Sequence, residues 1–203
     1  LRQYKIINSY YKVTINKKIP VFSGLGGGTA NAASIFKFFI KKKNNKIFEV
    51  FEKKIGSDFR LFFSKQTYQQ SLRKLNNYEK KYNLFFLLIY PNLKCSTKEI
   101  YSKVDKFSSK SKINFLKLRS KREFIDLIKN EKNDLQSPVI KKFPIIQKII
   151  NFMATQKGCH FARITGSGSV CFGVFSSNEL AQAALGRVNK KYTSYWCKVA
   201  RTI

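Results

Sequence analysis

The sequence predicts an α+β protein, because helical and strand-like patterns both occur along it and its last strands are joined by turns of hairpin length. The chain has 203 residues, of which 43% are hydrophobic and 15% aromatic, which is enough to form a core. No apolar run approaches the ~18 residues that a membrane-spanning helix needs, and the longest one extends from Leu84 to Tyr90. We therefore expect one large domain or two small ones, and no membrane partner.

The N-terminal part contains one predicted strand and two predicted helices. Residues 11–15 alternate between apolar and polar side chains, as a half-buried strand does. A glycine-rich loop over 23–29 then opens directly into a helix with apolar residues along one face. A second helix, at about 47–54, is followed by Gly56, a residue type that commonly ends helices.

A polar stretch over 68–81 is the expected boundary between two lobes, which divides the chain into residues 1–81 and 82–203. The second part contains helices and strands in alternation. Their predicted order is strand 84–90, helices 97–104, 115–129 and 144–154, strand 162–165, a glycine-rich turn, strand 170–175, helix 178–189 and strand 195–200. The sequence shows no internal repeat.

The net charge is strongly positive: 40 Lys and Arg residues against 11 Asp and Glu residues give +29. Such a charge is typical of proteins that bind nucleic acid or another polyanion. Lysine outnumbers arginine here, however, whereas nucleic-acid readers favour arginine, and abundant Lys, Asn, Ile, Phe and Tyr also follow from A/T-rich coding. The basic runs 41–43, 53–54 and 190–191 fall at predicted helix ends, where cations stabilise the helix dipole. We therefore favour a solvated basic surface and expect no nucleic-acid partner.

The cysteine pattern gives no indication of zinc. The four cysteines form no Cys-x-x-Cys pair, and His160 is the single histidine. Three of the four lie in apolar surroundings, which favours buried thiols in a reducing compartment. Because nothing at the start resembles a signal peptide, we expect a cytoplasmic protein.

The strongest motif is the segment Gly24-Leu25-Gly26-Gly27-Gly28-Thr29, which lies between a predicted strand and a predicted helix. Consecutive glycines expose backbone N–H groups, and a helix start adds a positive dipole end, so the segment predicts an anion cradle suited to phosphates. It is not a Walker loop, which needs Lys and then Ser or Thr after its last glycine, and it lacks the third glycine of a dinucleotide fingerprint. A plain flexible turn is the alternative interpretation.

Two weaker motifs accompany this loop. Residues 165–169 form a second loop of small residues, which alone indicates only a hairpin but which is able to close over a triphosphate if paired with the first loop. Asp58, in Gly56-Ser57-Asp58, lies between a helix end and an apolar run, where we expect it to be partly buried beside a ligand. A positioned carboxylate accepts the proton of a hydroxyl that attacks phosphorus. A simple turn or helix-capping role for Asp58 is equally consistent with the sequence.

Several motifs occur in an order that resembles one known family. They are Ile19-Pro20, then Gly24 to Ala33, Gly56-Ser57-Asp58, Pro91 with Ser96-Thr97 and Tyr101, Asn133-Asp134-Leu135, and Thr165-Gly166-Ser167-Gly168. Together they resemble the GHMP small-molecule kinases and, within them, the kinases that phosphorylate 4-diphosphocytidyl-2-C-methyl-D-erythritol in non-mevalonate isoprenoid synthesis. The resemblance covers essentially the whole chain.

The resemblance implies ATP and Mg²⁺ as cofactors and assigns roles to particular residues. Asp58 would be the catalytic base, Thr97 and Tyr101 would contact the substrate, and Thr29 would lie near the metal-bound phosphates. The residues implied to bind ATP are Pro20, Val21, Phe22, Ser23, Gly24, Leu25, Gly26, Gly27, Gly28, Thr29, Ala30, Gly166, Ser167 and Gly168.

The resemblance also implies a two-lobed fold, with part of an N-terminal α/β lobe followed by a ferredoxin-like C-terminal lobe. Members of the family carry a Pro-x-Lys-x-Asn motif ahead of these segments, so we expect the chain to be cut at its N-terminus and to show little turnover by itself. A monomer or a homodimer is expected. Two alternatives stay open: another GHMP small-molecule kinase, and a basic RNA-binding module without enzymatic activity.

Overall fold

The computed structural model describes residues 1–40, 45–64, 66–72, 74–78, 80–109 and 118–202. The chain divides into two compact units. The first comprises Leu1–Val21 and Gly26–Tyr78, and the second comprises Phe22–Leu25 and Glu79–Ile203. The short segment Phe22–Leu25 therefore belongs to the second unit, although the residues on both sides of it belong to the first.

The second unit is built on a four-stranded antiparallel sheet with the strand order β4-β5-β3-β6. Its strands are β3 (Phe85–Tyr90), β4 (Cys159–Ile164), β5 (Cys171–Phe175) and β6 (Trp196–Arg201). The central strand β3 pairs with β5 on one side and with β6 on the other, so that Leu87 lies opposite both Gly173 and Val199. This is the split βαββαβ order of a ferredoxin-like fold, and the predicted fold class is confirmed.

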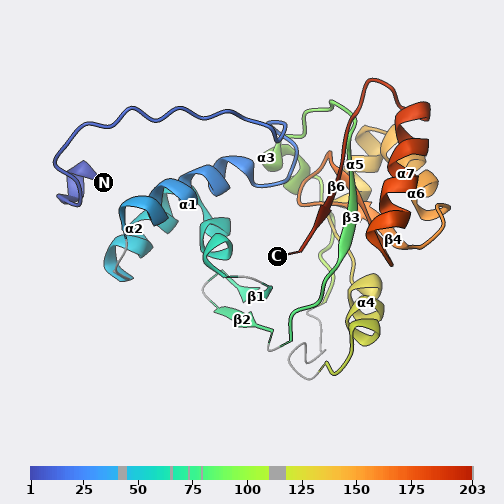
Figure 1. The fold of residues 1–203 in the computed structure, drawn as a ribbon, viewed down its shortest axis with the longest axis horizontal. Coiled ribbons are helices and arrows are strands. Elements are labelled where there is room, and N and C mark those ends of the chain that lie inside the picture. The colour runs from blue at the N-terminus through green and yellow to red at the C-terminus, as the bar shows by residue number, and fades with distance from the viewer. Residues whose placement is uncertain (41–44, 65, 73, 79, 110–117, 203) are drawn as a thin grey trace. The chain divides into compact units, whose positions relative to one another are not determined.

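Two helices cover one face of this sheet, as Figure 1 shows: α6 (Ile145–Ala154) and α7 (Asn178–Lys191). Between them and the sheet lies the main hydrophobic core, in which Leu87 and Ile89 of the central strand are fully buried. The helix α7 begins at Ser177, whose hydroxyl oxygen accepts a hydrogen bond from the Leu180 N–H at 3.3 Å. Packing in the core thus holds the sheet in place, and the sheet in turn positions the loops at the ends of its strands.

Three further helices lie between β3 and α6: α3 (Thr97–Tyr101), α4 (Lys121–Asn130) and α5 (Gln136–Lys142). The guanidinium group of Arg163 closes the C-terminal end of α4, because it donates to the carbonyl oxygens of Ile128 and Glu131. The sequence did not predict α5. Residues 115–117 of the helix predicted over 115–129 lie outside the described residues, and α4 begins after them at Lys121.

The other predicted helices and strands of the second unit are confirmed, with ends that shift by a few residues. The largest shift at a strand lies in β4, which begins at Cys159, three residues before the predicted strand 162–165. All of the helices are short, and none within the described ranges has the length and apolarity needed to cross a bilayer.

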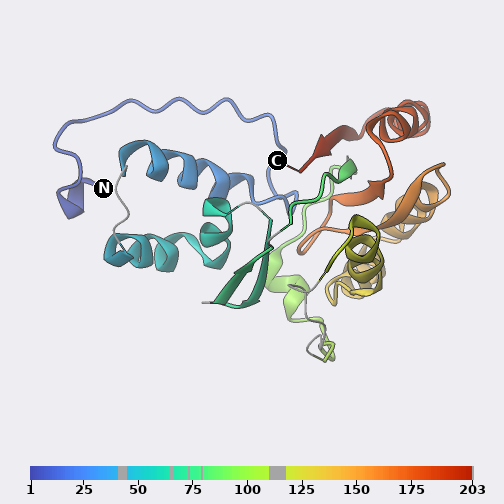
Figure 2. The ribbon, with the colours of Figure 1, turned by 60° about the horizontal axis from the view of Figure 1, so that its bottom comes forward.

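The first unit contains the helices α1 (Gly27–Phe39) and α2 (Asn45–Ile55), which lie side by side in Figures 1 and 2. They are followed by a 3₁₀ segment, η2 (Ser57–Phe63), and by a hairpin of β1 (Thr67–Ser71) and β2 (Lys74–Asn77). A short 3₁₀ turn, η1 (Arg2–Tyr4), lies near the N-terminus. The hairpin falls inside the polar stretch that the sequence analysis interpreted only as a boundary.

Aromatic rings form the core of the first unit. Phe36 of α1 is 5% exposed, and its ring contacts four others, with centroid distances of 5.8, 5.1, 5.4 and 5.5 Å to Phe48, Phe51, Phe59 and Phe63. All four contacts have the edge-to-face geometry that aromatic pairs favour. This cluster joins α1 to α2 and to η2, the segment that carries Asp58.

The strand predicted over residues 11–15 is wrong. The structure has no strand there, and within the described part of the chain no neighbouring strand pairs with this segment. Its apolar side chains are exposed, since Tyr11, Val13 and Ile15 retain 55%, 52% and 48% of their accessible surface. Alternation predicts which side chains share a face, but a strand also needs a partner for its backbone N–H and C=O groups.

Two thiols of the second unit, that of the buried Cys171 and that of the partly buried Cys159, predict a loss of stability in alkali. Burial raises the pKa of Cys171 to about 12 and that of Cys159 to about 11, whereas an unfolded thiol has a pKa of about 8.5. Folding therefore favours the protonated thiols: their stabilising contribution is complete below about pH 8.5 and is lost as the pH rises toward the folded pKa values. We expect the urea midpoint to fall between pH 8 and about pH 10.5.

The matched control for this prediction is Cys171→Ala, which removes the thiol with the higher of these two pKa values. The variant should be less stable than the wild type at pH 8 because of the cavity that it leaves. Its midpoint should nevertheless change less steeply with pH. Equal slopes in the two proteins would show that Cys171 does not contribute to the pH dependence.

Candidate nucleotide and substrate site

The loop between β4 and β5, residues 165–169, is a tight turn with two left-handed glycines. The Gly168 N–H donates to the Thr165 carbonyl oxygen at 2.9 Å, and the Thr165 N–H donates to the Val170 carbonyl oxygen at 3.0 Å. Gly166 and Gly168 have φ values of 52° and 81°, which favour glycine. Within the described residues, the N–H groups of Gly166 and Ser167 donate to no acceptor, and Gly166 is exposed whereas Ser167 is buried, so the Gly166 N–H is the more accessible of the two to an anion.

The amide of Asn133 braces this loop from the side of α5. Its Nδ2 donates to the carbonyl oxygens of Ile164 at 3.2 Å and Gly166 at 2.9 Å, while its Oδ1 accepts from the Leu135 N–H at 3.0 Å. A side chain with both a donor and an acceptor is needed for this pattern. The first residue of the Asn-Asp-Leu motif, Asn133, thus has a structural role, because its amide holds the 165–169 loop.

The backbone at Ser23 and Gly24 packs against the same loop. The Val170 N–H donates to the Ser23 carbonyl oxygen at 3.2 Å, and the Thr165 hydroxyl donates to the Gly24 carbonyl oxygen at 3.4 Å. A Cβ on Gly24 would lie 2.7 Å from the Thr165 carbonyl oxygen and 2.8 Å from that of Gly168. The second unit thus brings together two segments that are 141 residues apart and that the sequence analysis assigned to ATP binding.

The predicted substrate residues Thr97 and Tyr101 both lie on α3, in the same unit. The Thr97 hydroxyl lies 3.0 Å from the Ser167 hydroxyl, a hydrogen bond that connects α3 to the tip of the 165–169 loop. The Tyr101 ring is half exposed, and its centroid lies 6.5 Å from that of Phe107. Thr97 therefore lies next to a predicted nucleotide residue, and Tyr101 offers an accessible ring.

Two features that the sequence analysis missed hold α3 in place. Glu99 binds Lys142 of α5, with distances of 2.7 and 2.5 Å from Nζ to the two carboxylate oxygens, and it binds Lys103 at 3.0 Å. These ammonium groups, Lys142 first, lower the pKa of Glu99. The Ser96 hydroxyl accepts from the Glu99 N–H at 3.4 Å, so that Ser96-x-x-Glu99 has the sequence of a capping box, a signal that was available in the sequence.

We predict that Glu99→Gln loosens α3. The amide keeps the shape of the carboxylate but loses the charge that holds two ammonium groups, so the N–H groups of residues 98–104 should exchange with solvent several-fold faster. Hydrogen exchange followed by mass spectrometry measures this directly. Because the pKa of Glu99 is lowered in the folded protein, the wild type should lose the same protection as the pH falls below about 4.3. The exposed pair Arg122–Asp126 of α4 provides a control through Asp126→Asn, which should leave exchange in α3 unchanged.

In the first unit, the residue before α1 is the N-cap Gly26, which is left-handed with a φ of 63° and provides no side-chain hydrogen bond to the helix. The first N–H groups of a helix have no partner within the helix, so those of Gly27, Gly28 and Thr29 point out of its N-terminal end. Gly28 is exposed, and a Cβ on it would meet nothing within 4 Å. Backbone donors and a positive dipole end are the features of an anion site.

Asp58 lies in the first turn of η2, directly after Gly56, whose φ is 123°. The motif predicts a partly buried carboxylate, and this prediction is wrong, because Asp58 is exposed. The next residue explains the difference: Phe59 takes the interior position with 0% exposure, and a single turn of chain does not bury both. An exposed carboxylate remains accessible to a substrate.

The turn that carries Asp58 is attached to α2 by an ion pair. The Arg60 guanidinium binds Glu52 in a bidentate manner, with 2.7 Å from Nε to one carboxylate oxygen and 2.5 Å from Nη2 to the other. These hydrogen bonds raise the pKa of Arg60. Within the described residues, no group of three or more His, Cys, Asp or Glu side chains forms a metal site.

The chain is similar to proteins of one kinase superfamily. A family model described as GHMP kinases C terminal matches residues 114–194. The fold resembles a crystal structure of 4-(cytidine 5'-diphospho)-2C-methyl-D-erythritol kinase, with a TM-score of 0.69, 20% identity, and coverage of 92% of this chain and 69% of the other. It is also similar to homoserine kinase from Cytophaga hutchinsonii, with a TM-score of 0.67, 16% identity, and coverage of 92% and 68%. The fold is therefore that of the GHMP kinases.

Sequence relatives narrow the class. The chain is 34% identical over 201 residues to 4-diphosphocytidyl-2-C-methyl-D-erythritol kinase of Pelagibacter ubique. The alignment covers 97% of this chain and 70% of that protein. The enzyme of the same name from a Wolbachia of Drosophila simulans is 30% identical over 194 residues, with coverage of 91% and 66%. That of Buchnera aphidicola is 34% identical over 178 residues, with coverage of 84% and 56%. The chain belongs to the GHMP kinases, in the family of the 4-diphosphocytidyl-2-C-methyl-D-erythritol kinases, and it spans between about half and 70% of these relatives' length.

Proposed function

We propose that the chain takes part in the ATP-dependent phosphorylation of the 2-hydroxyl of 4-diphosphocytidyl-2-C-methyl-D-erythritol. The observation that carries the proposal is the identity of 34% to a kinase of that name over 97% of the chain. The geometry agrees with it, since two loops of small residues expose backbone donors suited to phosphates.

In this proposal residues 20–30 and 166–168 bind ATP through backbone N–H groups, those of Gly27–Thr29 and of Gly166–Ser167 above all. The Thr29 hydroxyl would be one oxygen ligand for Mg²⁺, which is usually held by one or two carboxylates together with substrate phosphates and waters. An oxygen donor of this kind is compatible with Mg²⁺. A bound Mg²⁺ would neutralise the negative charge that develops on the phosphates during the transfer.

Asp58 acts as the general base. Its exposed carboxylate accepts the proton of the 2-hydroxyl as that oxygen attacks the γ-phosphorus, and the transfer proceeds in line without a phosphoenzyme. The bidentate Arg60–Glu52 pair and the buried Phe59 hold the Asp58 backbone in place. Catalysis then rests on positioning and on donors aimed at the phosphates.

Thr97 and Tyr101 contact the substrate: Thr97 through its hydroxyl beside Ser167, and Tyr101 through its accessible ring, which stacks on the cytosine. We also propose residues 1–81 as part of an N-terminal nucleotide lobe and residues 82–203 as the C-terminal lobe. A cytoplasmic monomer or homodimer completes the proposal.

Binding and turnover test the proposal separately. Titration calorimetry with Mg-ATP and with the cytidine-linked substrate should detect both ligands, and a coupled assay should detect ADP release. The 203 residues contain no Pro-x-Lys-x-Asn motif, so we expect turnover to be slow. Binding of neither ligand would contradict the proposal.

Asp58→Asn should reduce the rate of ADP release by about 10²–10⁴-fold, because the amide accepts no proton at neutral pH. Its affinity for Mg-ATP should stay near that of the wild type. The matched control is Asp126→Asn, which changes an exposed carboxylate on α4 and should retain the full rate. Equal rates for Asp58→Asn and the wild type would exclude Asp58 as the base.

Homoserine phosphorylation is the second candidate, because the TM-score to a homoserine kinase, 0.67, nearly equals that to the cytidine-linked enzyme, 0.69. The same coupled assay distinguishes the two. ADP release that depends on homoserine and not on the cytidine-linked substrate would favour this alternative.

A further inference from the structure

Phe22 combines two unfavourable features that its surroundings do not explain. Its φ is 57°, a left-handed conformation that costs a side chain bearing a Cβ and that glycine adopts freely. The residue is 63% exposed, so burial does not compensate for this cost. Strained residues of this kind commonly occur at functional positions.

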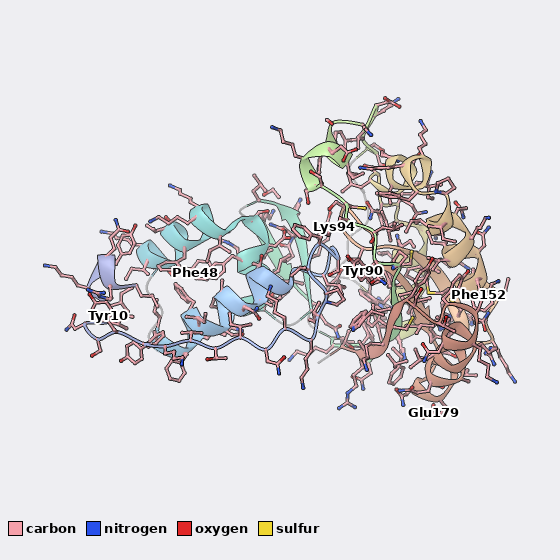
Figure 3. All side chains as sticks on the ribbon, turned by 90° about the horizontal axis from the view of Figure 1, so that it is seen from above. Tyr10, Phe48, Tyr90, Lys94, Phe152 and Glu179 are labelled. Carbon is pink, nitrogen blue, oxygen red and sulfur yellow. The ribbon has the colours of Figure 1, made fainter. Side chains whose placement is uncertain are left out.

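The ring of Phe22 lies beneath the ammonium group of Lys94. The Lys94 Nζ is 5.8 Å from the ring centroid, within the range of a cation–π contact. Lys94, labelled in Figure 3, lies in the segment that joins β3 to α3, three residues before Thr97. The contact therefore links the predicted ATP segment to the start of the predicted substrate helix.

Both residues are attached to the 165–169 loop through their neighbours. The Ser23 carbonyl oxygen, next to Phe22, accepts from the Val170 N–H at 3.2 Å. The Leu93 carbonyl oxygen, next to Lys94, accepts from the Ser169 hydroxyl at 2.5 Å. All of these residues belong to the second unit, so the backbone beside Phe22 and the backbone beside Lys94 are both bonded to the C-terminal end of the loop that contains Gly166 and Ser167.

The charge of Lys94 is also available, unlike that of two other lysines near α3. Lys103 and Lys142 both bind Glu99. Within the part of the chain that the structure describes, Lys94 forms no ion pair, and its side chain is exposed. An anion at the loop would therefore find one cation that no carboxylate neutralises.

We propose that Lys94 and Phe22 form a phosphate-binding arm beside the 165–169 loop, in which Lys94 pairs with a phosphate group of a bound nucleotide and the Phe22 ring holds the ammonium group in position. The inference rests on the proposed function, because it deepens the nucleotide site of that proposal. The phosphate belongs either to ATP or to the cytidine diphosphate part of the substrate.

Calorimetric titrations of the 203-residue chain with Mg-ATP and with CDP test the arm without requiring turnover. Lys94→Ala should raise the Kd for one of the two ligands by about 10-fold, the typical effect of a lost charge-assisted contact. Lys94→Arg should restore most of the affinity. The increase should shrink at 0.5 M salt, which a purely structural effect of the substitution would not do. The ligand that is affected identifies the source of the phosphate.

Two further variants complete the test. Lys190→Ala removes an exposed lysine at the end of α7 and should bind both ligands as the wild type does. Phe22→Gly relieves the left-handed strain, so it should fold at least as stably as the wild type yet bind the affected ligand more weakly. The proposal is overturned if the wild type binds while Lys94→Ala or Phe22→Gly binds equally well. A wild type that binds neither ligand would instead contradict the proposed function, and the arm with it.

Discussion

Gly24→Val is expected to abolish nucleotide binding and to destabilise the second unit. A Cβ at this position would lie 2.7 Å from one carbonyl oxygen and 2.8 Å from another, both belonging to backbone that is fixed by its own hydrogen bonds. The φ of 75° adds roughly 1–2 kcal/mol for any residue with a side chain. The loop at 165–169 therefore has to move away from Ser23 and Gly24, which removes the arrangement that we assign to phosphate binding.

Urea denaturation and Mg-ATP titration measure the two effects. The matched control is Gly186→Ala in α7, where a Cβ meets nothing within 4 Å and the backbone is helical. Alanine there should stabilise the protein by about 0.5–1 kcal/mol and leave binding intact. A Gly24→Val protein with wild-type stability and affinity would show that the close approach of the two loops is not required.

Phe36→Ala is expected to lower the free energy of unfolding of the first unit by about 3–5 kcal/mol. The ring contacts four other aromatic rings from α2 and η2, and it is nearly inaccessible to solvent. Its removal would leave a cavity at the place where these elements meet. Since η2 carries Asp58, the position of the proposed base depends on this packing.

The same helix provides the control for this substitution. Phe38 lies two residues further along α1 and is 70% exposed, so Phe38→Ala should change the free energy of unfolding by less than about 0.5 kcal/mol. The two variants remove the same group from the same helix and differ in burial. Equal losses of stability in chemical denaturation would contradict the role of the aromatic cluster.

The sequence predicted the sheet of the second unit well because its strands are local apolar runs. Phe85–Tyr90 and Cys171–Phe175 are each apolar almost throughout, and hairpin-length turns separate their neighbours. The helix α5 escaped prediction because it has only seven residues and contains Pro138, which a first helical turn tolerates. Short elements carry too few residues for periodicity to identify them.

The motifs of the site could be predicted from the sequence, but the contacts between residues far apart in the sequence could not. The glycine-rich segments are visible in the sequence because backbone geometry demands glycine there. The contact of Glu99 with Lys142 spans 43 positions, and that of Lys94 with Phe22 spans the two lobes expected from the sequence, so neither follows from local pattern. The exposure of Asp58 likewise depended on which of two adjacent residues, Asp58 or Phe59, faces the core.

The segment Phe22–Leu25 belongs to the second unit although it lies within the sequence of the first. The chain passes from one unit to the other three times, so no single cut separates them into complete halves. A fragment that starts after Tyr78 retains every strand of the four-stranded sheet but loses the tetrapeptide whose backbone hydrogen-bonds to Thr165 and Val170. The two units are compact in space, but neither is one continuous stretch of the sequence. A separate peptide with the sequence of residues 22–25 would have to supply the hydrogen bonds to Thr165 and Val170 that the truncation removes.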